Sequence, residues 1–176
     1  MGYATELCRS MNYLAQDSRA LFLGQAVAVP GTGMTTTLVD VPDHKKIELP
    51  VAEEMQMGMA IGMALAGYIP VTIYPRWNFL LLAANQLVNH LDKLKAMGGY
   101  TPKVIIRTGV GSERPLHPSF QHVGDFTEAF RLMFSTVEII RLDEPEDIFP
   151  AYKKALERTD GRSTVLVEWG DYYSEK

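Results

Sequence analysis

The stretch Pro50-Val51-Ala52-Glu53-Glu54 is the one from which the fold of the chain can be worked out. It joins a short extended segment to residues 55–66, whose small and methionine side chains predict a helix that Gly67 ends. A strand is predicted next, over residues 69–74, and the aromatic cluster Trp77-Asn78-Phe79 follows it. Two adjacent carboxylates therefore stand where an extended segment ends and a helix begins.

The bulk composition limits the classes of protein to which the chain can belong. Of its 176 residues 47% are hydrophobic, which is enough for one domain with a core. The net charge of −4 offers no basic face for nucleic acid, and no apolar run approaches the roughly 20 residues that span a bilayer. The single cysteine, Cys8, forms no internal disulfide, as is usual in a reducing compartment. We expect one soluble, cytoplasmic domain over residues 1–176, with no nucleic-acid or membrane partner.

Predicted strands and helices alternate along the chain. Strands are expected at residues 20–23, 46–49, 69–74, 103–107, 137–141 and 164–168, and helices at residues 3–16, 55–66, 78–97, 126–134 and 148–156. Such alternation is typical of a three-layer α/β/α fold with a mostly parallel sheet. Ligands of such sheets bind beyond the carboxyl ends of the strands, so Glu53, Phe79 and the loop of residues 108–122 are expected to share one edge.

The two carboxylates also have a simple structural explanation. Acidic side chains in the first turn of a helix are favoured by the helix dipole. For Glu54 this explanation is sufficient, whereas for Glu53 the residues alone leave a structural and a functional role open.

The remaining polar residues give weaker indications. His117 and His122 lie in a loop rich in glycine and proline, and such loops often carry function, although a solvated histidine is the commoner case. The four histidines show no metal-ligand spacing with each other or with Cys8, so no metal site is predicted in this chain. No phosphate-binding glycine motif and no local catalytic triad occur.

Several stretches, in a fixed order, resemble a known family. They are residues 23–28, Pro50-Val51-Ala52-Glu53, the helix with Gly58 and Gly62 that leads through Gly67 to the next strand, and Asn78-Phe79 with Asn85-Gln86. Together with the 26-residue step from Glu53 to Phe79, they look like the pyrimidine-binding domain of transketolase-like thiamine diphosphate enzymes. The nearest likeness is to the beta subunits of pyruvate, branched-chain 2-oxoacid and acetoin dehydrogenases. The resemblance covers nearly the whole chain and implies the thiamine diphosphate-binding fold.

The resemblance implies a role for each matching residue. Glu53 would hydrogen-bond the ring nitrogen of the cofactor's aminopyrimidine and so activate the cofactor. The main-chain carbonyl of Val51 would accept a hydrogen bond from the exocyclic amine, and Phe79 would pack against the pyrimidine ring. His122 falls near the family's active-site histidine, which handles protons of the substrate.

The chain also departs from the family's pattern. Pro75-Arg76 stand where the family has Met-Thr, so Arg76 would either meet an anionic substrate or form a surface salt bridge. The loop over residues 112–118, which contains His117, differs from the dehydrogenase pattern. His117 and Arg76 are therefore candidate substrate contacts, but the identity of the substrate does not follow.

Two family features are missing from the sequence, namely the Gly-Asp-Gly…Asn motif that holds diphosphate through magnesium and the C-terminal domain of the beta subunits. We therefore expect the chain to bind only the pyrimidine end of thiamine diphosphate, with Mg²⁺ held by a diphosphate-binding alpha-type subunit in an α2β2 heterotetramer. The chain would be half of a split enzyme, active only with that partner. Its reaction would be decarboxylation, or transfer of a two-carbon or acyl unit, on a 2-oxo acid or ketose-type substrate. The face with Gly58 and Gly62 and the helix over residues 78–97 are the expected assembly surfaces.

Two other functions compete with this prediction. A non-catalytic, scaffolding pyrimidine-type domain could complete a partner enzyme's dimer, but it would have no need of Glu53. An unrelated flavodoxin-like binding module is disfavoured because no phosphate loop occurs.

Overall fold

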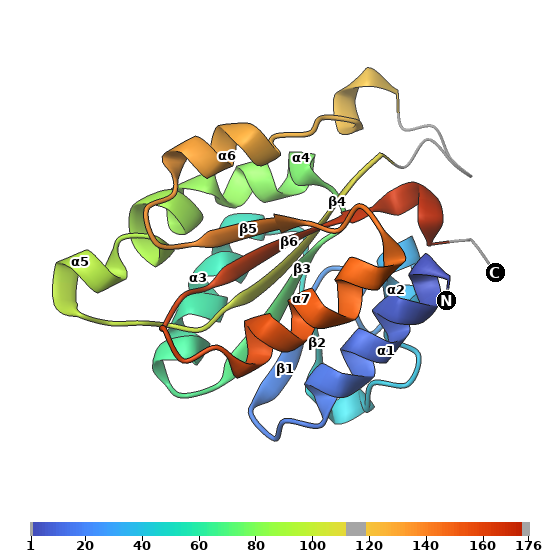
Figure 1. Ribbon diagram of the computed structural model, residues 1–176, viewed down its shortest axis with the longest axis horizontal. Coiled ribbons are helices and arrows are strands. Elements are labelled where there is room, and N and C mark those ends of the chain that lie inside the picture. The colour runs from blue at the N-terminus through green and yellow to red at the C-terminus, as the bar shows by residue number, and fades with distance from the viewer. Residues whose placement is uncertain (1, 112–118, 174–176) are drawn as a thin grey trace.

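A six-stranded sheet organises the fold (Figure 1), which we describe from a computed structural model for residues 2–111 and 119–173. The strand order is β2-β1-β3-β4-β6-β5, and all five strand pairs are parallel. The strands are β1 (Ala20–Gly24), β2 (Lys46–Glu48), β3 (Ile69–Tyr74), β4 (Ile105–Val110), β5 (Glu138–Arg141) and β6 (Thr164–Trp169). The predicted α/β fold with a parallel sheet is confirmed.

Helices cover both faces of this sheet, as Figure 1 shows. They are α1 (Tyr3–Ala15), α2 (Gly33–Thr36), α3 (Glu53–Leu65), α4 (Trp77–Leu80), α5 (Leu94–Gly98), α6 (Thr127–Met133) and α7 (Pro145–Glu157). Shorter turns are the 3-10 helices η1 (Asp43–Lys45), η2 (Leu81–Ala83), η4 (Phe120–His122) and η5 (Gly170–Tyr172), and the π-helix η3 (Gln86–Leu91). None of the helices within the described ranges has both the length and the apolar composition of a bilayer span.

Two hydrophobic cores lie on opposite faces of the sheet because successive strand residues point to opposite sides. Helices α1 and α7 lie side by side over one face, where they enclose Phe22 of β1 and Ile105 of β4. Helices α3, α4 and α6 cover the other face, which takes the next residue of each strand, Leu23 and Ile106. The inner strands β1 and β3 are buried on both sides, so their sequences are nearly continuous apolar runs rather than alternating patterns.

The predicted single helix over residues 78–97 is wrong. The segment is divided into α4, η2, the π-helix η3 and α5. At the end of η3 the Asp92 main-chain N–H donates to the carbonyl of Leu87 at 3.0 Å, a step of five residues instead of four. The other predicted strands and helices agree with the structure to within a few residues, and α2 lies in a stretch for which no helix was predicted.

Asp92 explains why the chain turns at this point. Its side chain is fully buried and accepts main-chain hydrogen bonds from Ser135, Thr136 and Val137, which lead into β5. Burial alone would raise the pKa of Asp92, but these bonds and the Lys93 ammonium lower it to about 2. The carboxylate therefore ties the end of the π-helix to the neighbouring strand.

A buried ion pair joins the central strands on the α1 and α7 face. Arg107 of β4 donates to both carboxylate oxygens of Glu168 of β6, at 2.7 and 2.9 Å, and both side chains are fully buried. Tyr152 of α7 and Tyr173, just after η5, also donate to Glu168, and Arg107 donates to Thr37 at 3.0 Å. Such additional bonds offset much of the cost of burying the two charges, although Arg107 Nη1 has no hydrogen-bond partner among the described residues.

Helix α3 is fastened to the sheet by Gln56, which is 2% exposed. Its Nε2 group donates to Thr72 Oγ1 at 2.8 Å and to the carbonyl of Ile73 at 2.9 Å, both on β3. Gly24, at the end of β1, has a φ of +154°, and a Cβ added there would lie 2.6 Å from the carbonyl oxygen of Ile73 and 3.2 Å from Gln56 Nε2. Only glycine therefore allows β1, β3 and α3 to approach so closely.

We expect Gly24→Ala to lower the free energy of unfolding by about 2 kcal/mol or more, since its Cβ would displace the carbonyl oxygen of Ile73. Gly58→Ala is the matched control, because a Cβ at Gly58 meets nothing within 4 Å, and alanine there should stabilise helix α3 by up to about 1 kcal/mol. Urea unfolding followed by circular dichroism measures both changes. Equal stability of the two variants would contradict the close approach at Gly24.

Candidate functional site

Glu53 is the first residue of α3, as predicted, and lies beyond the carboxyl end of β2. The residue is only 8% exposed, and within the described part of the chain its carboxylate makes no hydrogen bond or ion pair. Its main-chain carbonyl accepts a hydrogen bond from the buried Tyr74 hydroxyl at 3.4 Å. The first turn of α3 is thus held against the end of β3 while the carboxyl group itself stays available. Val51, two residues earlier, is 65% exposed.

Glu54 has the structural role expected of it. It is exposed in the first turn of α3 and accepts a hydrogen bond from Gln86 of η3 at 3.3 Å. The two adjacent carboxylates therefore differ in burial and in bonding, which supports separate roles for them.

Three of the predicted site residues meet beyond the ends of β3 and β4. Arg76 is the N-cap of α4, Phe79 lies within α4, and His122 ends η4. The Arg76 Nη1 group donates to the main-chain oxygen of His122 at 3.2 Å. The Phe79 and His122 rings lie 5.2 Å apart between centroids, with an interplanar angle of 34°. Of the two predicted roles of Arg76, an anionic-substrate contact or a surface salt bridge, neither is seen among the described residues, where a main-chain carbonyl is its hydrogen-bond partner.

Asp171 of η5 is a neighbour of this group that the sequence patterns did not indicate. Partial burial lowers the pKa of Arg76, and the negative charge of Asp171 opposes that shift. A Cβ added to Gly111, which follows β4 and has a φ of +74°, would lie 2.7 Å from Asp171 Oδ2. The sequence could have indicated this neighbour, because Asp171 comes just after the last strand and the carboxyl ends of parallel strands share an edge.

Several buried polar atoms around α4 lack hydrogen-bond partners among the described residues. They are Trp77 Nε1, Asn78 Oδ1, Thr108 Oγ1 and His122 Nδ1, and α4 contacts both β4 and η4. Buried polar groups are nearly always bonded in complete structures. The cluster therefore retains hydrogen-bonding capacity for a ligand, for water or for a second chain.

Two further predictions are His117 as a substrate contact and the expectation of no metal site in this chain. His117 lies outside the described residues. Among the residues that are described, no group of three or more His, Cys, Asp or Glu side chains is arranged to hold a metal ion.

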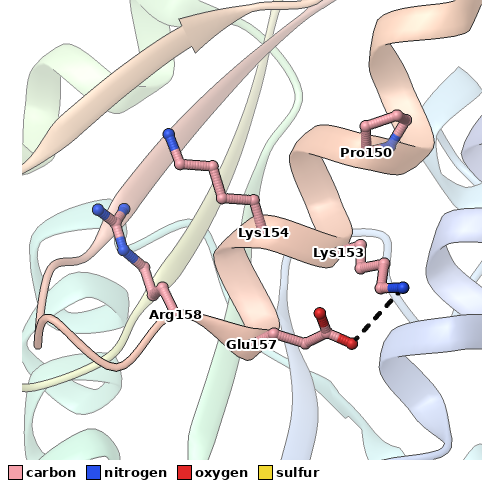
Figure 2. Close-up of a pocket in the computed structure, with 5 residues that line it drawn as sticks. All are labelled: Pro150, Lys153, Lys154, Glu157 and Arg158. Atoms are coloured by element: carbon pink, nitrogen blue, oxygen red, sulfur yellow. Dashed lines mark ion pairs between the residues drawn. The ribbon is translucent and has the colours of Figure 1, made fainter.

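The hollow shown in Figure 2 lies on α7, on the face of the sheet opposite α3. Its lining residues are Pro150, Lys153, Lys154, Glu157 and Arg158. Lys154 and Arg158 pair with Glu138 at 2.6 and 2.8 Å, and Lys153 lies 3.9 Å from Glu157. Because its cations are already paired and none of the predicted site residues lines it, we place the candidate site at the carboxyl edge of the sheet instead.

Comparison with known proteins shows the family. The model described as "Transketolase, pyrimidine binding domain" matches residues 8–171. The chain belongs to this transketolase pyrimidine-binding domain family, and the resemblance inferred from the sequence is confirmed.

Particular relatives agree with this assignment. The chain is 32% identical to a pyruvate dehydrogenase E1 component subunit beta of Cyanidium caldarium over 107 residues, which cover 57% of the chain and 33% of the relative. It is 28% identical to a 3-methyl-2-oxobutanoate dehydrogenase subunit beta of Mycobacterium tuberculosis over 152 residues, covering 81% and 42%. The chain thus matches less than half the length of these relatives.

A solved structure shares the fold. It is titled "Split gene transketolase, inactive beta4 tetramer" and superimposes with a TM-score of 0.71. The similarity covers 97% of this chain and 52% of that one, at 14% sequence identity.

Glu48, the last residue of β2, stabilises the loop next to the site. Its carboxylate accepts main-chain hydrogen bonds from the four consecutive residues 26–29, at 2.6, 2.8, 2.7 and 3.3 Å. Desolvation alone would raise the pKa of Glu48, but these four N–H groups hold it below its ordinary value. Glu48 therefore fixes the loop after β1 to the end of β2, five residues before Glu53.

Glu48 should make stability depend on pH. Because its folded-state pKa is depressed, its contribution is fully present above its ordinary value near 4.5 and is lost as the pH falls through the lower folded value. We expect the wild type to exceed Glu48→Gln in free energy of unfolding at pH 7, with the difference shrinking below pH 4.5. Denaturant melts from pH 3 to pH 7 measure this. A difference that did not vary with pH would contradict the role of the ionised carboxylate.

Proposed function

We propose that this chain is the pyrimidine-binding subunit of a split thiamine diphosphate-dependent enzyme, and that residues 1–176 act as a single domain. The observation that carries the proposal is the isolated carboxyl group of Glu53, which is nearly buried and unbonded among the described residues. The family assignment and the dehydrogenase beta-subunit relatives support it. A protein without catalytic work at this position would have no reason to keep a desolvated carboxyl without a partner.

The described residues fit the aminopyrimidine end of the cofactor. Glu53 offers a carboxyl group that can share a proton with a ring nitrogen. Val51 is an exposed residue whose main-chain carbonyl would accept from the exocyclic amine in this proposal, and Phe79 offers a partly buried flat ring for stacking. When bound, thiamine diphosphate supplies the carbon chemistry for making or breaking a bond next to a carbonyl group.

His122 is the side chain that we assign to protons of the substrate. Its ring lies against Phe79, and its Nδ1 atom has no partner in the described part of the chain. An imidazole ring carries one nitrogen that can donate a hydrogen bond and one that can accept, and histidine is the side chain most often used for proton transfer in enzymes. The substrate class that we propose is a 2-oxo acid or a ketose, whose carbonyl group such chemistry requires, and His117 remains a candidate contact with it.

The rest of the cofactor requires a second subunit in this proposal. We propose that a diphosphate-binding alpha-type chain holds the diphosphate and Mg²⁺, and that two copies of each chain form an α2β2 heterotetramer in a reducing cytoplasm. The exposed face of α3 supports such an assembly, because Met55, Met59 and Leu65 are 46%, 37% and 49% exposed. Outside the backbone of α3 itself, no described residue lies within 4 Å of a Cβ added to Gly58 or Gly62, so the face is open to close approach.

The proposal predicts opposite outcomes for the two adjacent carboxylates. With the alpha-type partner, Mg²⁺ and thiamine diphosphate, Glu53→Gln should lower kcat by about 100-fold or more, because the acid that activates the cofactor is lost. Glu54→Gln, the matched control, should retain kcat within a factor of about two, since its side chain only bonds Gln86 at the surface. Steady-state rates on a panel of 2-oxo acids and ketose phosphates measure both.

Calorimetry separates this proposal from the scaffolding alternative. Cofactor binding should appear in the mixture of the two chains and in neither chain alone. If Glu53→Gln supported the same turnover as the wild type in an assembled complex, the chain would be a scaffold and the assigned role of Glu53 would be wrong.

A further inference from the structure

The turn that carries His122 has little structure of its own to hold it. η4 is three residues long, and none of its residues is buried. Its first residue, Phe120, is 95% exposed, and the hydrogen bond that closes the turn, from His122 N to Ser119 O, is long at 3.5 Å. Ser119, which precedes the turn, has a positive φ of 63°, a backbone conformation that residues other than glycine rarely adopt. The position of His122 must therefore depend on contacts with other elements.

Among the described residues, two contacts link His122 to another element, and both involve α4 or its N-cap. The guanidinium of Arg76 donates to the His122 main-chain oxygen at 3.2 Å, and the Phe79 ring lies 5.2 Å from the imidazole. Arg76 and Phe79 are separated by one turn, so one short helix holds both the backbone and the ring of His122. The helix itself is fixed, because its Trp77 is fully buried and packs on Phe130 of α6 with ring centroids 4.9 Å apart.

Arg76 is suited to such a structural bond. It is partly buried, and desolvation lowers its pKa while Asp171 opposes the shift. A planar guanidinium loses little freedom for each hydrogen bond that it forms, which favours a fixed geometry over a mobile charge. A charged donor to a carbonyl is also stronger than a neutral one.

We propose that Arg76 is a positioning residue that holds His122 beside Phe79, rather than a residue that binds an anionic substrate. The kinetic consequence rests on the proposed function, whereas the geometric one does not. Displacement of a proton-transferring group by about an ångström is enough to lower a rate by up to 100-fold. Loss of Arg76 should therefore act on kcat through His122 and leave substrate affinity nearly unchanged.

The geometric part is tested by NMR on the purified 176-residue chain. In the wild type, ring protons of His122 and Phe79 should show a nuclear Overhauser effect. It should be lost in Arg76→Met and retained at least in part in Arg76→Lys, whose ammonium can still donate to the carbonyl. The control is Arg131→Met, since Arg131 also donates to a main-chain carbonyl, that of Ile139 at 3.4 Å, but lies on α6. An effect that persisted in Arg76→Met would overturn the proposal.

The kinetic part uses the complex with the alpha-type partner. Arg76→Met should lower kcat by between about 10- and 100-fold with KM changed less than about threefold, and Arg76→Lys should recover part of kcat. A rise in KM at unchanged kcat, with the Overhauser effect intact, would make Arg76 a substrate-binding residue instead. If the wild-type complex showed no turnover, the proposed function would fail, while the NMR result would still decide the geometric role. Should Arg76→Met not fold by circular dichroism, Arg76→Gln, whose amide is too short to reach, takes its place.

Discussion

The hydrogen bonds of Gln56 are the constraint on which the arrangement of the site depends. Neighbouring parallel strands are joined by long crossover connections rather than by tight turns. Each element that follows a strand must therefore be anchored by its own contacts. Gln56 binds α3 to the end of β3, and the missing side chain of Gly24 lets β1 come equally close. With Tyr74 bonded to the carbonyl of Glu53, the first turn of α3, which carries Glu53, is held against the end of β3.

The two faces of the sheet contribute differently. On one, the buried pair of Arg107 and Glu168 joins β4 to β6, and Tyr173 attaches the residues after β6 to the same pair. This attachment brings η5 with Asp171 to the carboxyl edge. On the other face α3, α4 and η4 carry Glu53, Phe79 and His122. The hydrogen-bonded network around Arg107 and Glu168 therefore lies on one face of the sheet. The candidate site residues are carried by short elements associated with the other face, as is common where loops carry function.

The sequence predicts the regular parts of this fold well, because buried strands and an acidic helix start are local patterns. It also indicates Glu53 and Phe79, whose positions follow from the ends of β2 and β3. Other features depend on contacts between distant residues. The π-helix over Gln86–Leu91 has the same apolar spacing as an α-helix, and only the bonds of Asp92 to residues 135–137 show why it ends. The bond from Arg76 to the His122 carbonyl spans 46 residues and involves a main-chain atom, so no side-chain pattern could reveal it.

The carboxylate of Glu48 also affects whether a phosphate group can bind to the loop after β1, at the carboxyl edge of the sheet. Successive main-chain N–H groups at the end of a strand normally form a concave site for phosphate. Here the N–H groups of residues 26–29 already surround an anion that belongs to the chain itself. A phosphate approaching this loop would find its donors occupied and would be repelled by a fixed negative charge. The loop after β1 is therefore poorly suited to hold the diphosphate of a cofactor, which is consistent with the proposal that this chain takes only the aminopyrimidine end.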